Sequence, residues 1–263
     1  MTVGEALRRA EERLAAAGVD TPRVDAELLV AHVLGVSRTG VYAERDRAIP
    51  DGLEPLVERR RQREPLAYVL GEWGFRGLTL KIDARALVPR PETEVVVERA
   101  LDLIRELGEP RVLDVGVGSG AIALAIAGEH PGARVTGVDL SPAALELAAE
   151  NAARLDLGID LRRAGSEAAG EGWDLVISNP PYVPQGALSS LQPELEWEPR
   201  EALVEAGLHD EIARAAATRW LVLEVGDGQA CRVAETLEAI GYTDVAMRKD
   251  LAGIERVVEG RRA

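Results

Sequence analysis

The chain has 263 residues, enough for one large domain or for a medium domain with a smaller one beside it. Its formal net charge of −14 argues against a broad phosphate-binding surface, and its single cysteine, Cys231, excludes an internal disulfide framework. No run of residues has the length and apolarity of a membrane span, and the N-terminus lacks the pattern of a signal peptide. We therefore expect a cytoplasmic protein. The three histidines are scattered and offer no metal-ligand spacing.

The first 72 residues are predicted to form a small domain of helices. Thr2 and Glu5 have the spacing of a capping box, which starts the first helix, and Gly18 ends it. Further helices are expected from Pro22 to Gly35 and at residues 53–63, with a brief segment at 41–45. The last helix carries a basic run from Arg59 to Arg63. We interpret this run as the solvated face of a helix, with a docking surface for a partner as the alternative.

The pattern changes near residue 72. Leu78, Leu80 and Ile82 alternate with polar side chains, which is the period of a β-strand. Together with Tyr68-Val69 and the glycines at 71, 74 and 77, this strand predicts a β-hairpin between two domains. We expect a helical domain at 1–72, a hairpin linker at 73–90 and a second domain at 91–263.

Helices and strands alternate through the second domain. Helices are expected at 93–107, from Ser119, and from Pro142, where Ser141 supplies the cap. The expected strands are Arg111–Val115, Ala133–Asp139, Ile159–Arg163, Trp173–Ser178, Arg219–Val225, Thr243–Arg248 and Arg256–Glu259. Such alternation predicts an α/β fold, with a mostly parallel sheet of seven strands covered by helices on both faces.

A glycine-rich loop joins the first of these strands to the next helix. It reads Asp114-Val115-Gly116-Val117-Gly118-Ser119-Gly120, and its glycines allow a tight turn and the close approach of a ligand to the backbone. Asp139 ends the second strand, where a carboxylate can accept both hydroxyl groups of a ribose. The two features together favour an adenosine-containing cofactor over glycines that only pack a helix on the sheet.

The same loop is less suited to a dinucleotide. Its spacing is G-x-G-x-G rather than G-x-G-x-x-G, and the charge of Asp114 would repel a pyrophosphate. A cationic sulfonium cofactor matches this charge better. The sequence therefore predicts S-adenosylmethionine.

The tetrapeptide Asn179-Pro180-Pro181-Tyr182 directly follows the buried strand at 173–178. Each proline fixes its φ angle and lacks an N–H group, so the carbonyl groups of Asn179 and Pro180 have little freedom. They are preset acceptors for a planar NH2 group. A plain turn at the end of a strand is the alternative interpretation, and the glycine-rich loop upstream favours the functional one.

With these motifs the chain resembles the class I S-adenosylmethionine-dependent methyltransferases, and among them the N5-glutamine methyltransferases of peptide chain release factors. The resemblance covers nearly the whole chain, and the pairing of Pro89–Glu94 with Asn179–Tyr182 is its most specific part. Its other segments are Pro65–Glu72 leading to Phe75, Leu87-Val88, Asp114–Gly120, Asp139, Asn151-Ala152, Glu198–Arg200 and Glu224–Gly226 with Gln229.

This resemblance implies a Rossmann-like methyltransferase sheet, with a helical N-terminal domain that recognises the protein substrate. It assigns the cofactor to Gly116, Val117, Gly118, Ser119 and Gly120, with Asp139 on the ribose and Asn179 beside them. It assigns the glutamine of the Gly-Gly-Gln loop in class 1 release factors to Asn179, Pro180, Pro181 and Tyr182, with Phe75 and Arg90–Glu92 as walls. No metal, membrane or directly bound nucleic acid is expected.

The chemistry of an amide gives this assignment a reason. An amide nitrogen is a poor nucleophile because its lone pair is delocalised into the carbonyl group. If the side-chain oxygen of Asn179 and the carbonyl of Pro180 accept its two hydrogens, the lone pair can be aimed at the sulfonium methyl group, while Tyr182 packs on the flat amide. The expected reaction is a direct in-line displacement without a covalent enzyme intermediate.

The chain departs from the family pattern at three places. Val117 stands where Thr is usual, and Ser166 stands where Asp is usual, so the contact to adenine could fall to Glu167. The segment 202–220 is shorter than usual, and we expect a trimmed loop or helix there.

Three alternatives to release factor methylation stay open. One is methylation of a glutamine in a ribosomal protein, which the same site chemistry would serve. Another is methylation of adenine N6 in a nucleic acid, against which the acidic charge weighs. The third is a cofactor-binding module without activity.

Overall fold

The computed structural model describes residues 1–262, with only the backbone for residues 188–190. The chain divides into two compact units. The first comprises Met1–Glu72 together with Gln192–Trp197, and the second comprises Trp73–Leu191 together with the chain from Glu198 onward. The assignment of Gln192–Trp197 to the first unit was not anticipated from the sequence.

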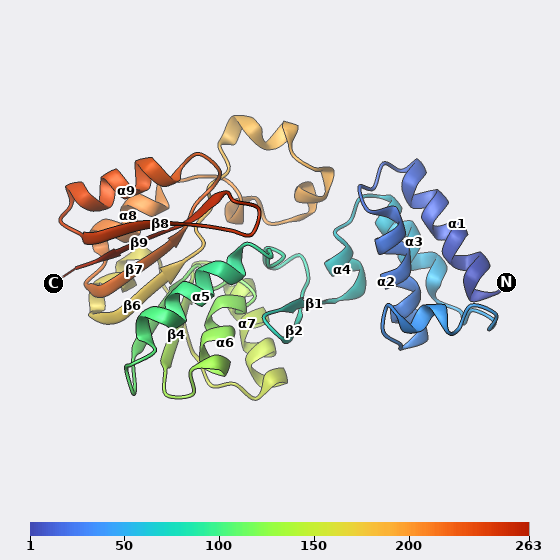
Figure 1. Ribbon diagram of the computed structural model, residues 1–263, viewed down its shortest axis with the longest axis horizontal. Coiled ribbons are helices and arrows are strands. Elements are labelled where there is room, and N and C mark those ends of the chain that lie inside the picture. The colour runs from blue at the N-terminus through green and yellow to red at the C-terminus, as the bar shows by residue number, and fades with distance from the viewer. Residues whose placement is uncertain (263) are drawn as a thin grey trace. The chain divides into compact units, whose positions relative to one another are not determined.

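The first unit is a bundle of helices around an apolar core (Figure 1). A capping box starts its first helix, since the Glu5 N–H donates to Thr2 Oγ1 over 3.3 Å and the Thr2 N–H donates to Glu5 Oε2 over 2.9 Å. Leu14 and Leu29 are fully buried in the core. The helices are α1 (Val3–Ala16), α2 (Pro22–Leu34), the 3-10 turn η1 (Gly40–Tyr42), α3 (Leu53–Arg61) and α4 (Leu66–Leu70).

The sequence prediction of a hairpin that includes Tyr68 and Val69 is wrong. Tyr68 and Val69 do not belong to a hairpin but lie in the short helix α4. Pro65 occupies the N-cap position of this helix, and Gly71 ends it in a left-handed conformation with φ +76°. Alternating apolar residues therefore begin only after Gly71, in β1 (Glu72–Phe75) and β2 (Leu78–Lys81), which form a two-stranded sheet.

The basic run on α3 is bound to acidic side chains of its own unit. Arg60 is buried and pairs with Asp25 over 2.6 Å and with Glu194 over 2.8 Å. Arg63 also reaches Glu194, over 2.7 Å. Arg59 pairs with Glu64 beyond the end of the helix. The interpretation of this run as a solvated helix face is therefore wrong for Arg60, and Glu194 ties the segment Gln192–Trp197 to the helices.

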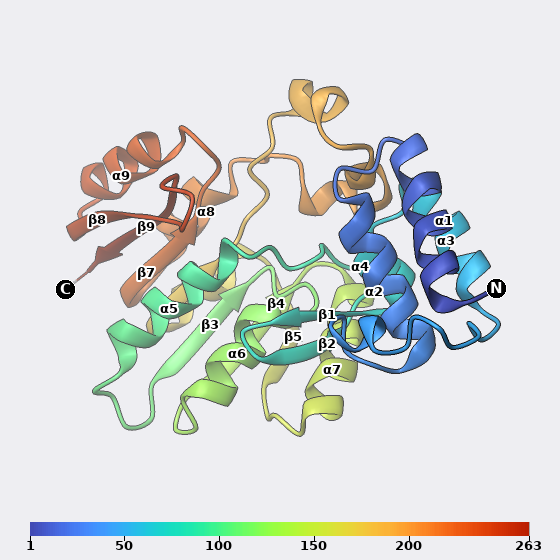
Figure 2. The same cartoon turned by 45° about the vertical axis from the view of Figure 1, so that its right-hand side comes forward.

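The second unit is built on a seven-stranded sheet in the order β5-β4-β3-β6-β7-β9-β8 (Figures 1 and 2). The first five strands of this order run parallel, whereas β9 is antiparallel to both of its neighbours. The predicted α/β fold, with its mostly parallel sheet of seven strands, is confirmed. The strands are β3 (Arg111–Val115), β4 (Arg134–Asp139), β5 (Asp160–Arg163), β6 (Trp173–Ser178), β7 (Thr218–Glu224), β8 (Thr243–Lys249) and β9 (Glu255–Arg261).

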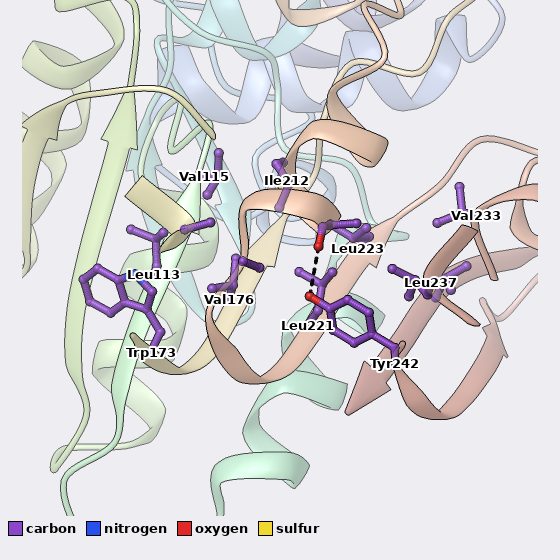
Figure 3. Close-up of a cluster of buried hydrophobic side chains, with 14 of the residues drawn as sticks. Leu113, Val115, Trp173, Val176, Ile212, Leu221, Leu223, Val233, Leu237 and Tyr242 are labelled. Carbon is purple, nitrogen blue, oxygen red and sulfur yellow. Dashed lines mark hydrogen bonds between the residues drawn. The ribbon is translucent and has the colours of Figure 1, made fainter. Parts of the chain in front are cut away.

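Helices cover both faces of this sheet. Helices α5 (Thr93–Ile104), α6 (Ala121–Glu129) and α7 (Pro142–Leu155) lie on one face. The other face packs against η2 (Ser166–Glu171), α8 (Leu208–Ala215) and α9 (Ala230–Ala239). Figure 3 shows the apolar cluster on this second face, where Leu113, Val176 and Leu221 meet Ile212 and Leu237. Three short 3-10 turns follow β6 along the chain. The turns η3 (Gln185–Ser190) and η5 (Arg200–Ala202) belong to this unit, and η4 (Pro193–Trp197) belongs to the first.

Candidate active site

Four parallel strands place their carboxyl ends at one edge of the sheet. In the ladder Val115 pairs with Val138 and with Ser178, and Ser178 pairs with Leu223. The loops that follow β3, β6 and β7 begin with Gly116, Asn179 and Val225, and Asp139 is the last residue of β4. The separate motifs of the sequence therefore meet at this edge. Ligands of α/β sheets bind outside the carboxyl ends of the strands, which makes this edge the candidate site.

The glycine-rich loop folds back against the end of β4. Gly116, Gly118 and Gly120 have φ angles of +77°, +54° and +86°, a region that residues with a Cβ rarely adopt. The N–H of Gly118 donates to Asp139 Oδ2 over 3.0 Å, and the N–H of Ser141 donates to Asp139 Oδ1 over 2.9 Å. Each carboxylate oxygen keeps a further acceptor site, so Asp139 can still bind a pair of hydroxyl groups.

Asp114 lies directly beneath this loop and is fully buried. Its Oδ2 accepts the N–H of Ala123 over 3.1 Å, whereas its Oδ1 has no partner among the described residues. Burial raises the pKa of this carboxyl group to about 7, and the charge of Asp139 adds to the shift. The unpaired oxygen of Asp114 and the neighbouring carboxylate of Asp139 favour a cationic ligand. A sulfonium cofactor carries such a positive charge.

The side of the site beside β5 contains a residue that the sequence analysis missed. Leu140 follows Asp139 and is 67% exposed, so its side chain is open to a ligand bound beside Asp139. Its sequence signal is an apolar residue directly after a strand-ending acid. The Glu167 carboxylate accepts the N–H of Gly165 over 2.9 Å, and the Ser166 hydroxyl donates to Glu211 over 3.4 Å.

The Asn-Pro-Pro-Tyr segment is fixed at its first residue by two side-chain contacts. The hydroxyl of Ser178, the residue before it, donates to the carbonyl of Val115 over 2.6 Å. The side-chain nitrogen of Asn179 donates to Thr93 Oγ1, at the start of α5, over 3.3 Å. This contact uses the nitrogen of the amide and leaves its oxygen available to a ligand.

Tyr182, at the other end of this segment, is held through its ring and its backbone. Its hydroxyl donates to Glu224 Oε1 over 3.4 Å, and its carbonyl accepts the Gln229 side chain over 2.9 Å. Gly226 leaves room for the ring, because a Cβ there would lie 3.0 Å from Tyr182 Cδ2. Burial and the neighbouring Glu224 raise the pKa of Tyr182 well above its usual value, so the phenol stays protonated.

The segment before α5 is clamped by a buried glutamate. Glu198 accepts the N–H of Val88 over 3.0 Å and pairs with Arg90. Phe75 is buried. Glu92 lies near enough to Glu224 for its charge to act on that carboxyl group. In the part of the chain that the structure describes, no cluster of three or more His, Cys, Asp or Glu side chains could hold a metal ion.

The fold and this edge define a methyltransferase of the class I type. The catalytic domain of human METTL16 in complex with an RNA hairpin is similar, with a TM-score of 0.57, 18% identity, and coverage of 78% of this chain and 80% of that chain. A 16S rRNA methyltransferase from Thermus thermophilus has a TM-score of 0.54, 18% identity, and coverage of 73% and 50%. At these identities the likeness shows the fold alone.

The family follows from the sequence relatives. The family model described as PrmC N-terminal domain matches residues 5–71, and the Methyltransferase small domain matches residues 97–208. The release factor glutamine methyltransferase of Deinococcus radiodurans is 41% identical over 100% of this chain and 99% of its own length. That of Vibrio cholerae is 39% identical over 99% and 97%. The chain belongs to the release factor glutamine methyltransferase family, and its methyl donor is S-adenosylmethionine.

No helix in the described part of the chain has the length and apolar character that a membrane crossing needs.

Proposed function

We propose that this chain methylates the side-chain nitrogen of the glutamine in the Gly-Gly-Gln loop of class 1 peptide chain release factors. The observation that carries the proposal is the fixed side-chain amide of Asn179. Its nitrogen donates to the Thr93 hydroxyl oxygen, which leaves its oxygen to accept a hydrogen bond from the substrate. Full-length relatives named as release factor glutamine methyltransferases support the same substrate.

The cofactor would be held by the glycine-rich loop and the residues around it. The cofactor would contact the backbone of Gly116, Val117, Gly118, Ser119 and Gly120. Asp139 would accept hydrogen bonds from the ribose hydroxyl groups. Leu140 would pack on the flat adenine ring, and Asp114 would offset the positive charge of the ligand. When bound, S-adenosylmethionine supplies the methyl group, which leaves its sulfonium sulfur as the substrate nitrogen attacks.

The substrate amide would be oriented by the Asn-Pro-Pro-Tyr segment. The side-chain oxygen of Asn179 and the carbonyl of Pro180 would accept its two hydrogens, with Pro181 keeping the turn rigid. Both acceptors would stabilise the positive charge that develops on nitrogen before one proton is lost. Tyr182, neutral and held at two points, would pack against the flat amide.

The alternatives have weaker support. Methylation of adenine is supported only by the fold-level likeness to an enzyme solved with an RNA hairpin. The net charge of −14 disfavours binding to nucleic acid phosphates. For methylation of a ribosomal protein, the relatives from Deinococcus radiodurans, Geobacter sulfurreducens and Vibrio cholerae give no support, because each is named a release factor glutamine methyltransferase. We further propose that the helical unit recognises the release factor, because one glutamine side chain offers little surface for specificity, and that the protein acts in the cytoplasm, where release factors work.

The test is methyl transfer from labelled S-adenosylmethionine to a purified release factor. We expect label on the wild-type release factor and none on a variant with Ala in place of the Gly-Gly-Gln glutamine. Equal label on both would show that another residue is the target. No label on either, with cofactor binding established by calorimetry, would reject the release factor as substrate.

A further inference from the structure

Glu224 is a buried carboxyl group beneath the Asn-Pro-Pro-Tyr segment. It is the last residue of β7 and has no exposed surface. Its Oε1 accepts the Tyr182 hydroxyl over 3.4 Å. The Thr93 hydroxyl lies near enough to the carboxyl group to lower its pKa. Its Oε2 has no partner among the described residues. A carboxyl group in this position costs folding free energy, because burial removes its hydration.

The hydrogen count at Thr93 links this carboxyl group to Asn179. The Thr93 oxygen accepts a hydrogen from the side-chain nitrogen of Asn179, so this amide keeps its oxygen for other partners. The single hydrogen of the Thr93 hydroxyl is then left for another acceptor, and the nearby Glu224 carboxyl group, whose pKa Thr93 lowers, can take it. Without an acceptor at Glu224, the Thr93 hydroxyl could rotate and donate to Asn179, and the amide could turn over.

We propose that Glu224 is a positioning residue for methyl transfer, whose carboxyl group fixes Asn179 through the Thr93 hydroxyl and fixes Tyr182 directly. This inference rests on the proposed function, because it concerns the orientation of the two side chains that would hold the substrate amide. Two of the four residues in the segment thus depend on one acceptor, reached from β7 rather than from their own loop.

The surroundings of Glu224 make it sensitive to pH. Burial raises the pKa of its carboxyl group to about 7, and the charge of Glu92 adds to the shift. Arg256 and the hydrogen bonds from Thr93 and Tyr182 act in the opposite direction. His209 contacts only the backbone carbonyl of Glu224, over 2.8 Å, and burial lowers the pKa of that imidazole.

The test compares Glu224→Met, which keeps the length of the side chain but removes the acceptor, with Glu224→Gln, which keeps an oxygen acceptor. We expect Glu224→Met to lower kcat on the release factor by about 10- to 100-fold, with the Kd of S-adenosylmethionine unchanged. Glu224→Gln should restore kcat to within about fivefold of wild type. A Glu224→Met enzyme within about twofold of wild-type kcat would overturn the proposal.

The pH profile gives a second readout that a merely structural role would not move. Wild-type kcat should rise as pH passes through about 7, because the ionised carboxylate is the stronger acceptor. The rise should be absent in Glu224→Gln. The same rise in both enzymes would assign it to another group and contradict the proposal.

Thr93 supplies a test that does not depend on how Glu224 variants fold. Thr93→Val removes the hydroxyl that joins Glu224 to Asn179, whereas Thr93→Ser keeps it. We expect a loss of kcat of about 10-fold or more in the first and near wild-type kcat in the second. Equal kcat values in the two variants would overturn the link.

A matched control is Glu259→Gln. Glu259 is a buried glutamate on the neighbouring strand, opposite Val222, and it pairs with Arg99 and Arg248. Its neutralisation should lower the melting temperature without changing kcat. If Glu259→Gln lost as much kcat as Glu224→Met, general destabilisation would explain both losses, and the positioning role of Glu224 would be rejected. Wild-type enzyme that does not label the release factor would instead reject the proposed function, so the two failures are distinct.

Discussion

The side-chain nitrogen of Asn179 donates to the hydroxyl oxygen of Thr93, joining the loop after β6 to the start of α5 across 86 positions of sequence. The contact sets which atom of the amide is left over for a ligand. It also means that the segment before α5 and the Asn-Pro-Pro-Tyr segment form one structural unit at the edge of the sheet, which gives their pairing in the sequence a physical reason.

Removing the Asn179 side chain should separate binding from catalysis. We expect Asn179→Ala to bind S-adenosylmethionine normally and to lose about 10²- to 10³-fold in kcat, because one acceptor for the substrate amide is gone. Calorimetry measures the first quantity and steady-state methylation of a release factor the second. Unchanged turnover would remove Asn179 from the mechanism.

Asp139 should matter for the cofactor before any substrate is present. Asp139→Ala loses the acceptor for the ribose and also frees the N–H groups of Gly118 and Ser141. We expect the Kd of S-adenosylmethionine to rise about 100-fold, which corresponds to about 2.7 kcal/mol. Calorimetry with the folded variant measures it. A Kd within a factor of three of wild type would contradict the ribose role.

The buried Asp114 gives the protein a pH-dependent stability. Its pKa is about 7 in the folded state and near 3.8 when exposed, so between these values the folded state binds more protons than the unfolded state. The free energy of unfolding therefore falls as pH rises from about 4 to 7, by at most about 4 kcal/mol from this group.

Asp114→Asn is the measurement for this prediction. Urea unfolding of the cofactor-free wild type and variant at pH 5 and pH 8 isolates the contribution, because the other titrating groups cancel in the difference. The variant should lose less stability than the wild type between the two pH values. Parallel losses would show that Asp114 stays ionised in the folded protein.

Gly137, in the middle of β4, should not tolerate a side chain. A Cβ there would lie 2.6 Å from Val117 Cγ2 and 3.1 Å from Leu161 Cδ2. We expect Gly137→Ala to destabilise the fold by about 1–3 kcal/mol. Val117→Ala in the same chain should recover part of this loss, since it removes the nearest atom. Additive losses in the double variant would contradict the clash.

Charge reversal in the basic run should act on stability in a position-dependent way. Arg60→Glu would place a third carboxylate beside Asp25 and Glu194 in a buried position, at a cost of about 3–5 kcal/mol. Arg61→Glu breaks only an exposed pair with Glu58, which solvent screens, and should leave the melting temperature close to that of the wild type. Thermal unfolding compares them, and equal melting temperatures would contradict the structural role of the run.

The sequence predicted what depends on local pattern. Strand ends such as Val115 and Ser178 were placed correctly because apolar runs stop at glycine or proline, and parallel strands then bring the motifs to one edge. Tyr68 and Val69 were misread because a five-residue helix is too short to show its period.

Contacts between residues far apart in the sequence could not be predicted from local patterns. Thr93 and Glu224 appeared only as parts of a family resemblance, and nothing local shows that one accepts from Asn179 and the other from Tyr182. The grouping of Gln192–Trp197 with the first unit likewise depends on Glu194 reaching Arg60 and Arg63 more than 130 positions earlier. Leu140 was missed because apolar residues after strands are usually buried.

The membership of Gln192–Trp197 in the helical unit has a consequence for anyone who wants to exchange that unit between enzymes. A graft of residues 1–72 onto another methyltransferase would leave Arg60 and Arg63 without Glu194, although Arg60 would keep Asp25. The helical unit is therefore discontinuous in the gene. A chimera has to carry both pieces if Arg60 and Arg63 are to keep their ion pairs with Glu194.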